Sequence, residues 1–130
     1  MKTAIVYAST TGNTEQLAMA IKEAAPESYF ATAESAEPEQ VLSADLILLG
    51  SPAMGAEQLE ESMEEFFSSI EGKISGKTVG LFGSYDWGNG QMLEDWADRV
   101  SAAGATVKGI AKAQLAPDAQ AIEEAKLLLK

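Results

Sequence analysis

Short apolar segments and amphipathic helical segments alternate along the whole chain. Strand-like apolar or β-branched runs occupy residues 2–8, 28–32, 46–49, 78–83 and 106–111, and helical spacing follows in 13–25, 38–42, 59–70, 91–103 and 117–129. Right-handed crossovers place helices on both faces of a parallel sheet, so this alternation predicts an α/β fold with a doubly wound five-stranded parallel sheet. The common strand order for such a sheet is 2-1-3-4-5, and ligands bind at the carboxyl ends of the strands where the order reverses. In this chain that point lies between the first and third strands.

Two helical segments indicate which side chains enter the core. Residues 59–70 carry one apolar stripe, made of Leu59, Met63, Phe66, Phe67 and Ile70. The acidic residues of that segment are expected to face water; they are Glu60, Glu61, Glu64 and Glu65. In residues 91–103 the inward positions are Leu93, Trp96 and Val100, and Gly104 is placed to end the helix. The Met and aromatic residues of both stripes are therefore predicted to be core.

The length and composition limit both the architecture and the chemistry. A chain of 130 residues that is 46% hydrophobic suffices for one buried core, which predicts a single domain over residues 1–130. With no Cys and no His, the chain has no disulfide, thiol nucleophile, Cys-ligated cluster or imidazole base. The apolar run 4–8 is too short for a signal-peptide core and no stretch reaches transmembrane length, so we expect a cytoplasmic protein.

The charge is strongly and unevenly acidic. Twenty acidic against nine basic residues give a net charge of -11, which argues against nucleic acid or an anionic membrane as a partner. Residues 23–71 contain twelve acidic residues and no Lys or Arg. This region is either a solvated face or an acidic docking surface for basic patches of partner proteins. The same charge favours a monomer.

Three predicted loops at the carboxyl edge of the sheet carry the residues of chemical interest. The first joins strand one to helix one and consists of Ser9, Thr10, Thr11, Gly12, Asn13 and Thr14. Its hydroxyls, backbone N–H groups and positive helix end suit a phosphate group. The loop contains no Lys or Arg, which speaks against a nucleoside triphosphate with Mg²⁺. Taken alone, the loop could also be a Thr-rich helix cap, but its position after strand one favours the phosphate site.

The second loop follows strand three and contains Ser51, Pro52, Ala53, Met54, Gly55, Ala56 and Glu57. Met54 has no periodic core position, so its polarizable side chain either covers a flat ring or folds onto the core. The third loop follows strand four and spans residues 83–90, with Ser84, Tyr85, Asp86 and Trp87. A Trp beside Gly in a loop suits stacking on a planar ligand, although packing over the end of the sheet is the alternative.

The three loops, in this order and spacing, resemble those of the short-chain flavodoxins over essentially the whole chain. The resemblance implies a non-covalently bound flavin mononucleotide (FMN), with its phosphate in the loop from Ser9 to Thr14 and Ser51 assisting. It also implies Met54 on the inner face of the flavin ring and Trp87 stacked on the outer face.

The resemblance further assigns the polar edge of the flavin. Glu57 would accept the N3–H group, and the Gly55 carbonyl would turn toward a protonated N5. Backbone groups of Ser84, Tyr85 and Asp86 would meet the N1 and O2 edge. Two residues depart from the pattern: Asp86 stands where Gly is common, and Ala56 stands where Asp, Asn or Gly suits the turn better.

A flavodoxin of this composition would be a low-potential one-electron carrier that shuttles electrons between redox proteins through the semiquinone/hydroquinone couple and has no substrate of its own. Acidic surroundings without a nearby cation disfavour the anionic, fully reduced flavin. An FMN-dependent quinone or nitro reductase is the first rival, for which the chain has little spare length. A receiver-type signalling module is the second, and Gly50 and Ser51 stand where its phosphoacceptor Asp would end strand three.

Overall fold

The computed structural model describes residues 2–8, 12–54, 58–85 and 90–130. Five strands form one parallel sheet in the order β2-β1-β3-β4-β5, as the sequence predicts. The strands are β1 (Thr3–Tyr7), β2 (Tyr29–Thr32), β3 (Leu46–Gly50), β4 (Thr78–Tyr85) and β5 (Thr106–Gln114). The connecting elements are α1 (Asn13–Ala24), α2 (Pro38–Leu42), α3 (Glu61–Ile70), the 3-10 turn η1 (Glu71–Lys73), α4 (Gln91–Ala102) and α5 (Ala119–Leu127).

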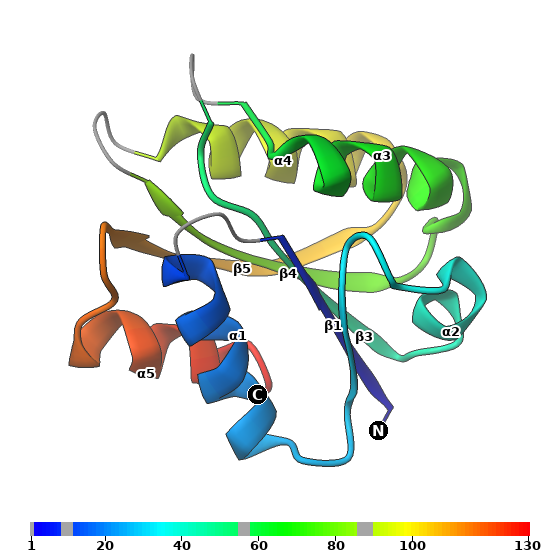
Figure 1. Cartoon of the computed structure of the whole chain (residues 1–130). Coiled ribbons are helices and arrows are strands. Elements are labelled where there is room, and N and C mark those ends of the chain that lie inside the picture. Colours follow the sequence, from blue (N-terminus) through cyan, green and yellow to red (C-terminus); the bar gives the residue numbers. More distant parts are fainter. Residues whose placement is uncertain (1, 9–11, 55–57, 86–89) are drawn as a thin grey trace.

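Helices cover both faces of the sheet, with α3 and α4 on one side and α1 and α5 on the other (Figure 1). The central strands β1 and β3 alternate between the two layers because successive side chains of a strand point to opposite faces. Val6 and Leu49 enter the layer beneath α3 and α4, whereas Ile5 and Leu48 enter the layer beneath α1 and α5. Burial on both faces explains why the central strands read as continuous apolar runs.

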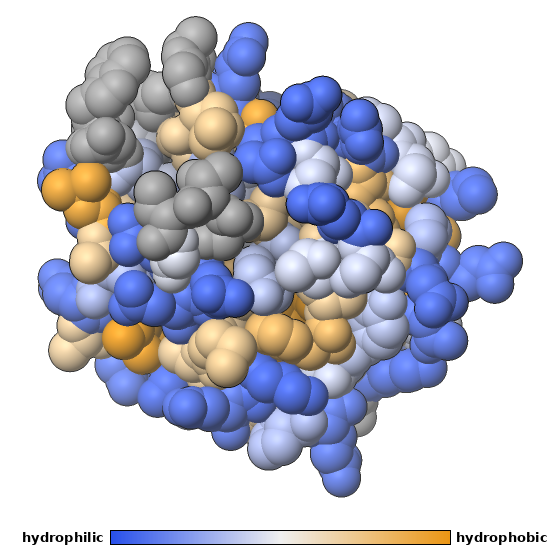
Figure 2. All heavy atoms as spheres, viewed as in Figure 1, coloured by the Kyte–Doolittle hydropathy of each residue, from blue (hydrophilic) through white to orange (hydrophobic). Residues whose placement is uncertain are grey.

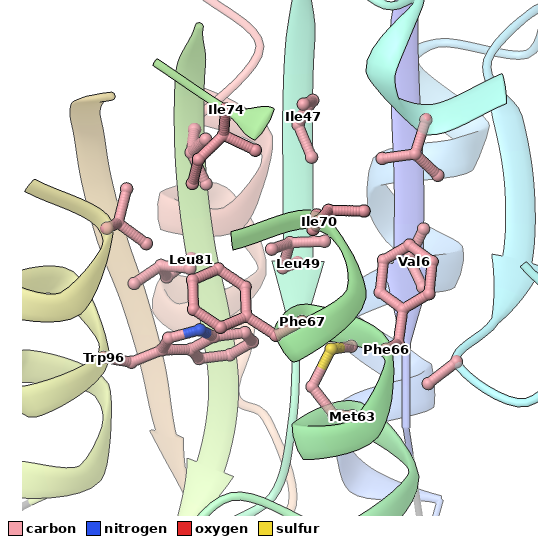
Figure 3. Packing of buried hydrophobic residues seen from close by; sticks show 14 of the residues in the cluster. Val6, Ile47, Leu49, Met63, Phe66, Phe67, Ile70, Ile74, Leu81 and Trp96 are labelled. Atoms are coloured by element: carbon pink, nitrogen blue, oxygen red, sulfur yellow. The ribbon is translucent and has the colours of Figure 1, made fainter. Parts of the chain in front are cut away.

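The predicted core stripes are confirmed. Met63, Phe66, Phe67 and Ile70 of α3 are buried against the sheet, and Trp96 of α4 packs edge-on against Phe67 with ring centroids 5.8 Å apart (Figure 3). Leu59 is only half-buried and precedes α3. The glycine predicted to end α4 does so with a positive φ of 94° at Gly104.

Two expectations about element ends need correction. The strand predicted for residues 78–83 continues through Ser84 and Tyr85, which pair with Ala113 and Gln114 of a β5 that is also longer than predicted. The helix predicted to include Leu59 and Glu60 begins at Glu61. Glu60 is its N-cap, and its carboxylate accepts the backbone N–H of Ser62 at 2.9 Å instead of facing water.

No helix within the described ranges combines the length and apolar character needed to span a bilayer. The same ranges contain no cluster of acidic side chains arranged to hold a metal ion.

Candidate functional site

The carboxyl ends of β1, β3 and β4 are joined side by side by backbone hydrogen bonds. The N–H of Ala8, directly after β1, donates to the carbonyl of Gly50 at 2.9 Å. The N–H of Ser51, directly after β3, donates to Phe82 at 3.1 Å, and that of Ala53 donates to Ser84 at 2.8 Å. From here the chain enters α1 on one face of the sheet after β1 and α3 on the other face after β3 (Figure 1). The three predicted loops therefore leave the sheet from one place, at the point where the strand order reverses.

The first loop delivers the N-terminus of α1 to this place. Gly12 precedes the helix with φ of 90°, a conformation that favours glycine, and no side chain among the described residues caps the helix. Thr14, in the first turn, is buried, and its hydroxyl lies 3.0 Å from that of Ser84 in β4. Gly12, Asn13 and Thr14 are thus placed at the carboxyl edge as predicted, whereas Ser9, Thr10 and Thr11 lie outside the described residues.

An acidic residue in the same turn is restrained by a tyrosine. The hydroxyl of Tyr7, at the end of β1, donates to the Glu15 carboxylate at 3.0 Å. Partial burial, together with this hydrogen bond and the charge of Glu15, raises the pKa of the Tyr7 phenol. Tyr7 therefore remains a neutral donor that fixes the Glu15 side chain beside the helix N-terminus.

The second loop is closed by two sets of hydrogen bonds. The Ser51 hydroxyl, fully buried, donates to the Pro52 carbonyl at 2.9 Å and accepts the N–H of Glu60 at 3.0 Å. Closer to the tip, Met54 and Gln58 exchange two backbone hydrogen bonds of 2.7 and 2.8 Å. The two sides of the loop are therefore joined at its base by Ser51 and nearer its tip by the Met54–Gln58 pair.

These contacts bear on the residues predicted in that loop. Met54 is 37% exposed and does not belong to either buried core cluster. The Ser51 hydroxyl is engaged within the protein, so its predicted help to a phosphate stays a prediction. Gly55, Ala56 and Glu57 lie outside the described residues, between the two residues of the Met54–Gln58 pair.

The third loop starts later than predicted because β4 is longer. Ser84 and Tyr85 belong to the strand, and the Tyr85 carbonyl accepts the N–H of Leu115 at 2.8 Å. Gly90 introduces α4 with φ of 77°. Asp86 and Trp87 lie outside the described residues, so the predicted stacking role of Trp87 remains a prediction.

Gly83 is a site residue that the sequence pattern did not single out. A Cβ at this position would lie within 3.0 Å of the Ser51 backbone oxygen and 3.3 Å from the Leu93 side chain. The close approach of β4 to the start of the second loop therefore requires glycine. The only signal in the sequence was a glycine at the last position of the predicted strand, a residue that often marks a close approach of backbones.

An ion-pair network ties the two helices that follow the second and third loops. Arg99 of α4 donates to Glu64 of α3 at 2.8 and 3.0 Å and to Glu71 of η1 at 3.0 and 3.3 Å, while its guanidinium lies 4.9 Å from the Phe67 ring centroid. The hydrogen bonds from Arg99 lower the pKa of the Glu64 carboxyl, and the two carboxylates raise the pKa of Arg99. Glu64, expected to face water, is instead a half-buried partner between helices.

Known proteins are similar to this chain in both sequence and fold. The family model described as flavodoxin matches residues 5–127. The chain is 46% identical over 119 residues to the flavodoxin of Megasphaera elsdenii, covering 88% of this chain and 87% of that protein. It is 43% identical over 108 residues to the flavodoxin of Clostridium beijerinckii, covering 79% and 78%.

The structural comparison agrees. The solution structure of two-electron reduced Megasphaera elsdenii flavodoxin matches with a TM-score of 0.87 and 41% identity, covering 97% of each chain. A flavodoxin structure from the domain Archaea matches with a TM-score of 0.86 and 26% identity, covering 98% of this chain and 93% of that one. The chain belongs to the flavodoxin family, as a short-chain member that binds FMN and carries electrons between redox proteins without a substrate of its own.

Proposed function

We propose that the three loops at the reversal of strand order bind FMN in the arrangement that the sequence predicts. The phosphate lies in the loop from Ser9 to Thr14, and the flavin ring lies between Met54 and Trp87. The observation that carries this proposal is the convergence of the loops: the carboxyl ends of β1, β3 and β4 are hydrogen-bonded to one another beside the N-terminus of α1.

The donors gathered there fit a phosphate. A helix N-terminus carries a partial positive charge and backbone N–H groups that have no partner within the helix. No described side chain caps α1, and the Thr14 hydroxyl stands in its first turn. A single terminal phosphate requires no Lys or Arg when helix dipole, N–H groups and hydroxyls act together.

The other contacts follow the sequence prediction. Met54 is an exposed residue at this edge, and its thioether would cover one ring face. In this proposal Glu57 accepts the N3–H group, the Gly55 carbonyl reaches N5, and the strand end at Ser84 and Tyr85, with Asp86, supplies the N1 and O2 edge. Backbone hydrogen bonds join Met54 to Gln58, the two residues that flank the tripeptide 55–57 in the sequence.

FMN, when bound, supplies the redox chemistry, and the chain's residues bind it, orient it and set its surroundings. The chain carries a net charge of -11, and Glu15 stands in the first turn of α1. Added negative charge on a group bound here is therefore disfavoured, which supports a low-potential carrier.

The same charge suggests the kind of partner. A groove of about 620 Å³ between α3 and α4 begins at Met54, and its acidic lining residues are Glu60, Glu61, Glu64 and Asp95. Hydrophilic side chains cover much of the face that carries the loops (Figure 2). We expect this surface to attract basic patches of redox enzymes, and we expect the protein to act as a cytoplasmic monomer that binds neither nucleic acid nor membranes.

A reconstitution experiment tests the proposal. The purified chain, freed of cofactor, should take up FMN in a one-to-one complex with flavin absorption bands and quenched flavin fluorescence. Reduced stepwise, it should pass electrons to cytochrome c, a basic one-electron acceptor, at a rate that falls as salt rises. Failure to bind FMN would refute the proposed site, and sustained turnover with NAD(P)H and a quinone would indicate the reductase instead.

A further inference from the structure

Two buried hydroxyls connect the first loop to the third. Thr14, in the first turn of α1, is 1% exposed, and Ser84, near the end of β4, is 5% exposed. Their oxygen atoms lie 3.0 Å apart although the residues are 70 positions apart in the chain. The bond therefore crosses from the helix at the proposed phosphate site to the strand that leads into the proposed ring site.

Ser84 is the better fixed of the two residues. Its backbone pairs with Ala113 in β5, and its carbonyl accepts the N–H of Ala53 from the second loop at 2.8 Å. Thr14 is held by the α1 backbone, and its hydroxyl has the Ser84 hydroxyl as a hydrogen-bond partner. A single strand residue thus contacts the first loop through its side chain and the second loop through its backbone.

Hydrogen-bond direction decides what this pair does for an anion. Each hydroxyl has one proton to donate and two lone pairs to accept with, and either atom of the pair can be the donor. If Thr14 donates to Ser84, it has no proton left for a phosphate oxygen, which only accepts. If Ser84 donates to Thr14, the Thr14 proton remains for the phosphate, and the chain of hydrogen bonds strengthens that donation.

We infer that Ser84 is a positioning residue for phosphate recognition: it donates to Thr14 and so directs the Thr14 hydroxyl toward the phosphate of FMN. The inference rests on the proposed site, and it adds a residue that acts on the phosphate from the third loop. It predicts that the Ser84 side chain contributes to the binding affinity of ligands that carry the phosphate and not to that of the flavin ring alone.

The test compares FMN with riboflavin, which lacks the phosphate. Fluorescence titration of the cofactor-free protein gives a dissociation constant for each ligand. Ser84→Ala should weaken FMN binding about three- to ten-fold, the equivalent of about 0.6–1.4 kcal/mol, and leave riboflavin binding unchanged. The inhibition constant of inorganic phosphate, calculated from its competition with FMN and corrected for the FMN affinity of each protein, should be larger for Ser84→Ala than for the unaltered protein.

Variants of Thr14 separate positioning from general damage. In a Thr14→Val background, Ser84→Ala should no longer change the ratio of FMN to riboflavin affinity, because the Thr14 hydroxyl that Ser84 directs has been removed. In a Thr14→Ser background, which keeps a hydroxyl, the effect should persist. Ser69→Ala is the matched control, since the Ser69 hydroxyl donates to the Phe66 carbonyl within α3 and to no other group among the described residues.

Urea unfolding of each cofactor-free variant records any loss of stability separately. Equal weakening of FMN and riboflavin by Ser84→Ala, or unchanged FMN binding, would overturn the inference and leave the proposed function intact. Failure of the unaltered protein to bind FMN would overturn the proposed function itself.

Discussion

Gly83→Ala tests whether the contact between β4 and the second loop holds the site together. The new Cβ would lie within 3.0 Å of the Ser51 backbone oxygen, a separation that Cβ atoms essentially never adopt. The clashing atom belongs to the backbone, which is held by the hydrogen bonds Ser51–Phe82 and Ala53–Ser84, so the rotation of a side chain cannot relieve the clash. The end of β3 must instead move away from β4.

The expected loss follows from that movement. Overpacking a tight interior costs about 1–3 kcal/mol, and each weakened hydrogen bond adds about 0.5–1.5 kcal/mol. The alanine returns about 0.4–1 kcal/mol by restricting the unfolded chain. With two weakened hydrogen bonds, the central values of these ranges give a net loss of about 3 kcal/mol, which is within the stability of a typical domain, so the variant should fold. FMN affinity should fall at least ten-fold because the second loop shifts relative to the other two.

Urea unfolding followed by circular dichroism measures the loss of stability, and fluorescence titration measures FMN affinity. Gly72→Ala is the matched control, because a Cβ at Gly72 meets nothing within 4 Å and its φ lies outside the left-handed region. The control should keep FMN affinity and gain or keep stability. Unfolding midpoint and FMN affinity both unchanged in Gly83→Ala would refute this account of the close approach.

Three further outcomes are expected. Arg99 lowers the pKa of Glu64, so the ion pair stabilises the fold above the ordinary Glu pKa, and this stabilisation is lost as pH falls through the lowered value. Since both side chains are more than a third exposed, Glu64→Gln should lower the free energy of unfolding by about 0.5–1 kcal/mol at pH 7 and by less in acid. A difference between the two urea unfolding curves that does not depend on pH would contradict this. Trp87→Ala should weaken FMN binding by at least about 0.5–1.5 kcal/mol and restore flavin fluorescence, and an unchanged titration would remove Trp87 from the site. Asp86→Asn should raise the potential of the second one-electron reduction, more at low salt than at high salt, and no shift at either ionic strength would mean that this carboxylate faces water.

The fold could be predicted because its determinants are local and repeated. Each buried strand is an apolar run, each helix carries one stripe, and the strict alternation of the two leaves few topologies. The strand order followed from that regularity. The ends of elements did not, since Ser84 and Tyr85 stand between glycine-rich segments in the sequence, and their pairing with Ala113 and Gln114 of β5 depends on residues far along the chain.

The site could be predicted as a set of loops but not as a set of contacts. Motif and position located Thr14 and Ser51 correctly at the carboxyl edge. Their hydrogen-bond partners could not be predicted from the sequence. Ser84, the partner of Thr14, lies 70 positions away, and Glu60, the partner of Ser51, was expected to be an exposed helix residue. Hydroxyl pairs and caps of this kind depend on tertiary placement, and their residue types are common in any loop.

Ala56→Gly tests how the tip of the second loop responds to reduction of the cofactor. The exchange of hydrogen bonds between Met54 and Gln58 fixes both ends of the tripeptide 55–57, so a change of peptide orientation there must be absorbed within three residues. Presenting the Gly55 carbonyl to N5 requires, in a type II turn, a positive φ at position 56. An L-residue with a Cβ loses about 1–2 kcal/mol in that conformation, whereas glycine adopts it readily.

Ala56→Gly should therefore relieve strain in the reduced form more than in the oxidised one. Relief of about 1 kcal/mol corresponds to a rise of about 40 mV in the potential of the first one-electron reduction, since a ten-fold change in equilibrium moves a one-electron couple by about 59 mV. Glycine also increases the freedom of the unfolded and oxidised loop, which offsets part of the gain. Potentiometric titration of both proteins at equal salt measures the shift. A fall in that potential would show that the loop does not turn in this way, because added backbone freedom at position 56 would then favour the oxidised form.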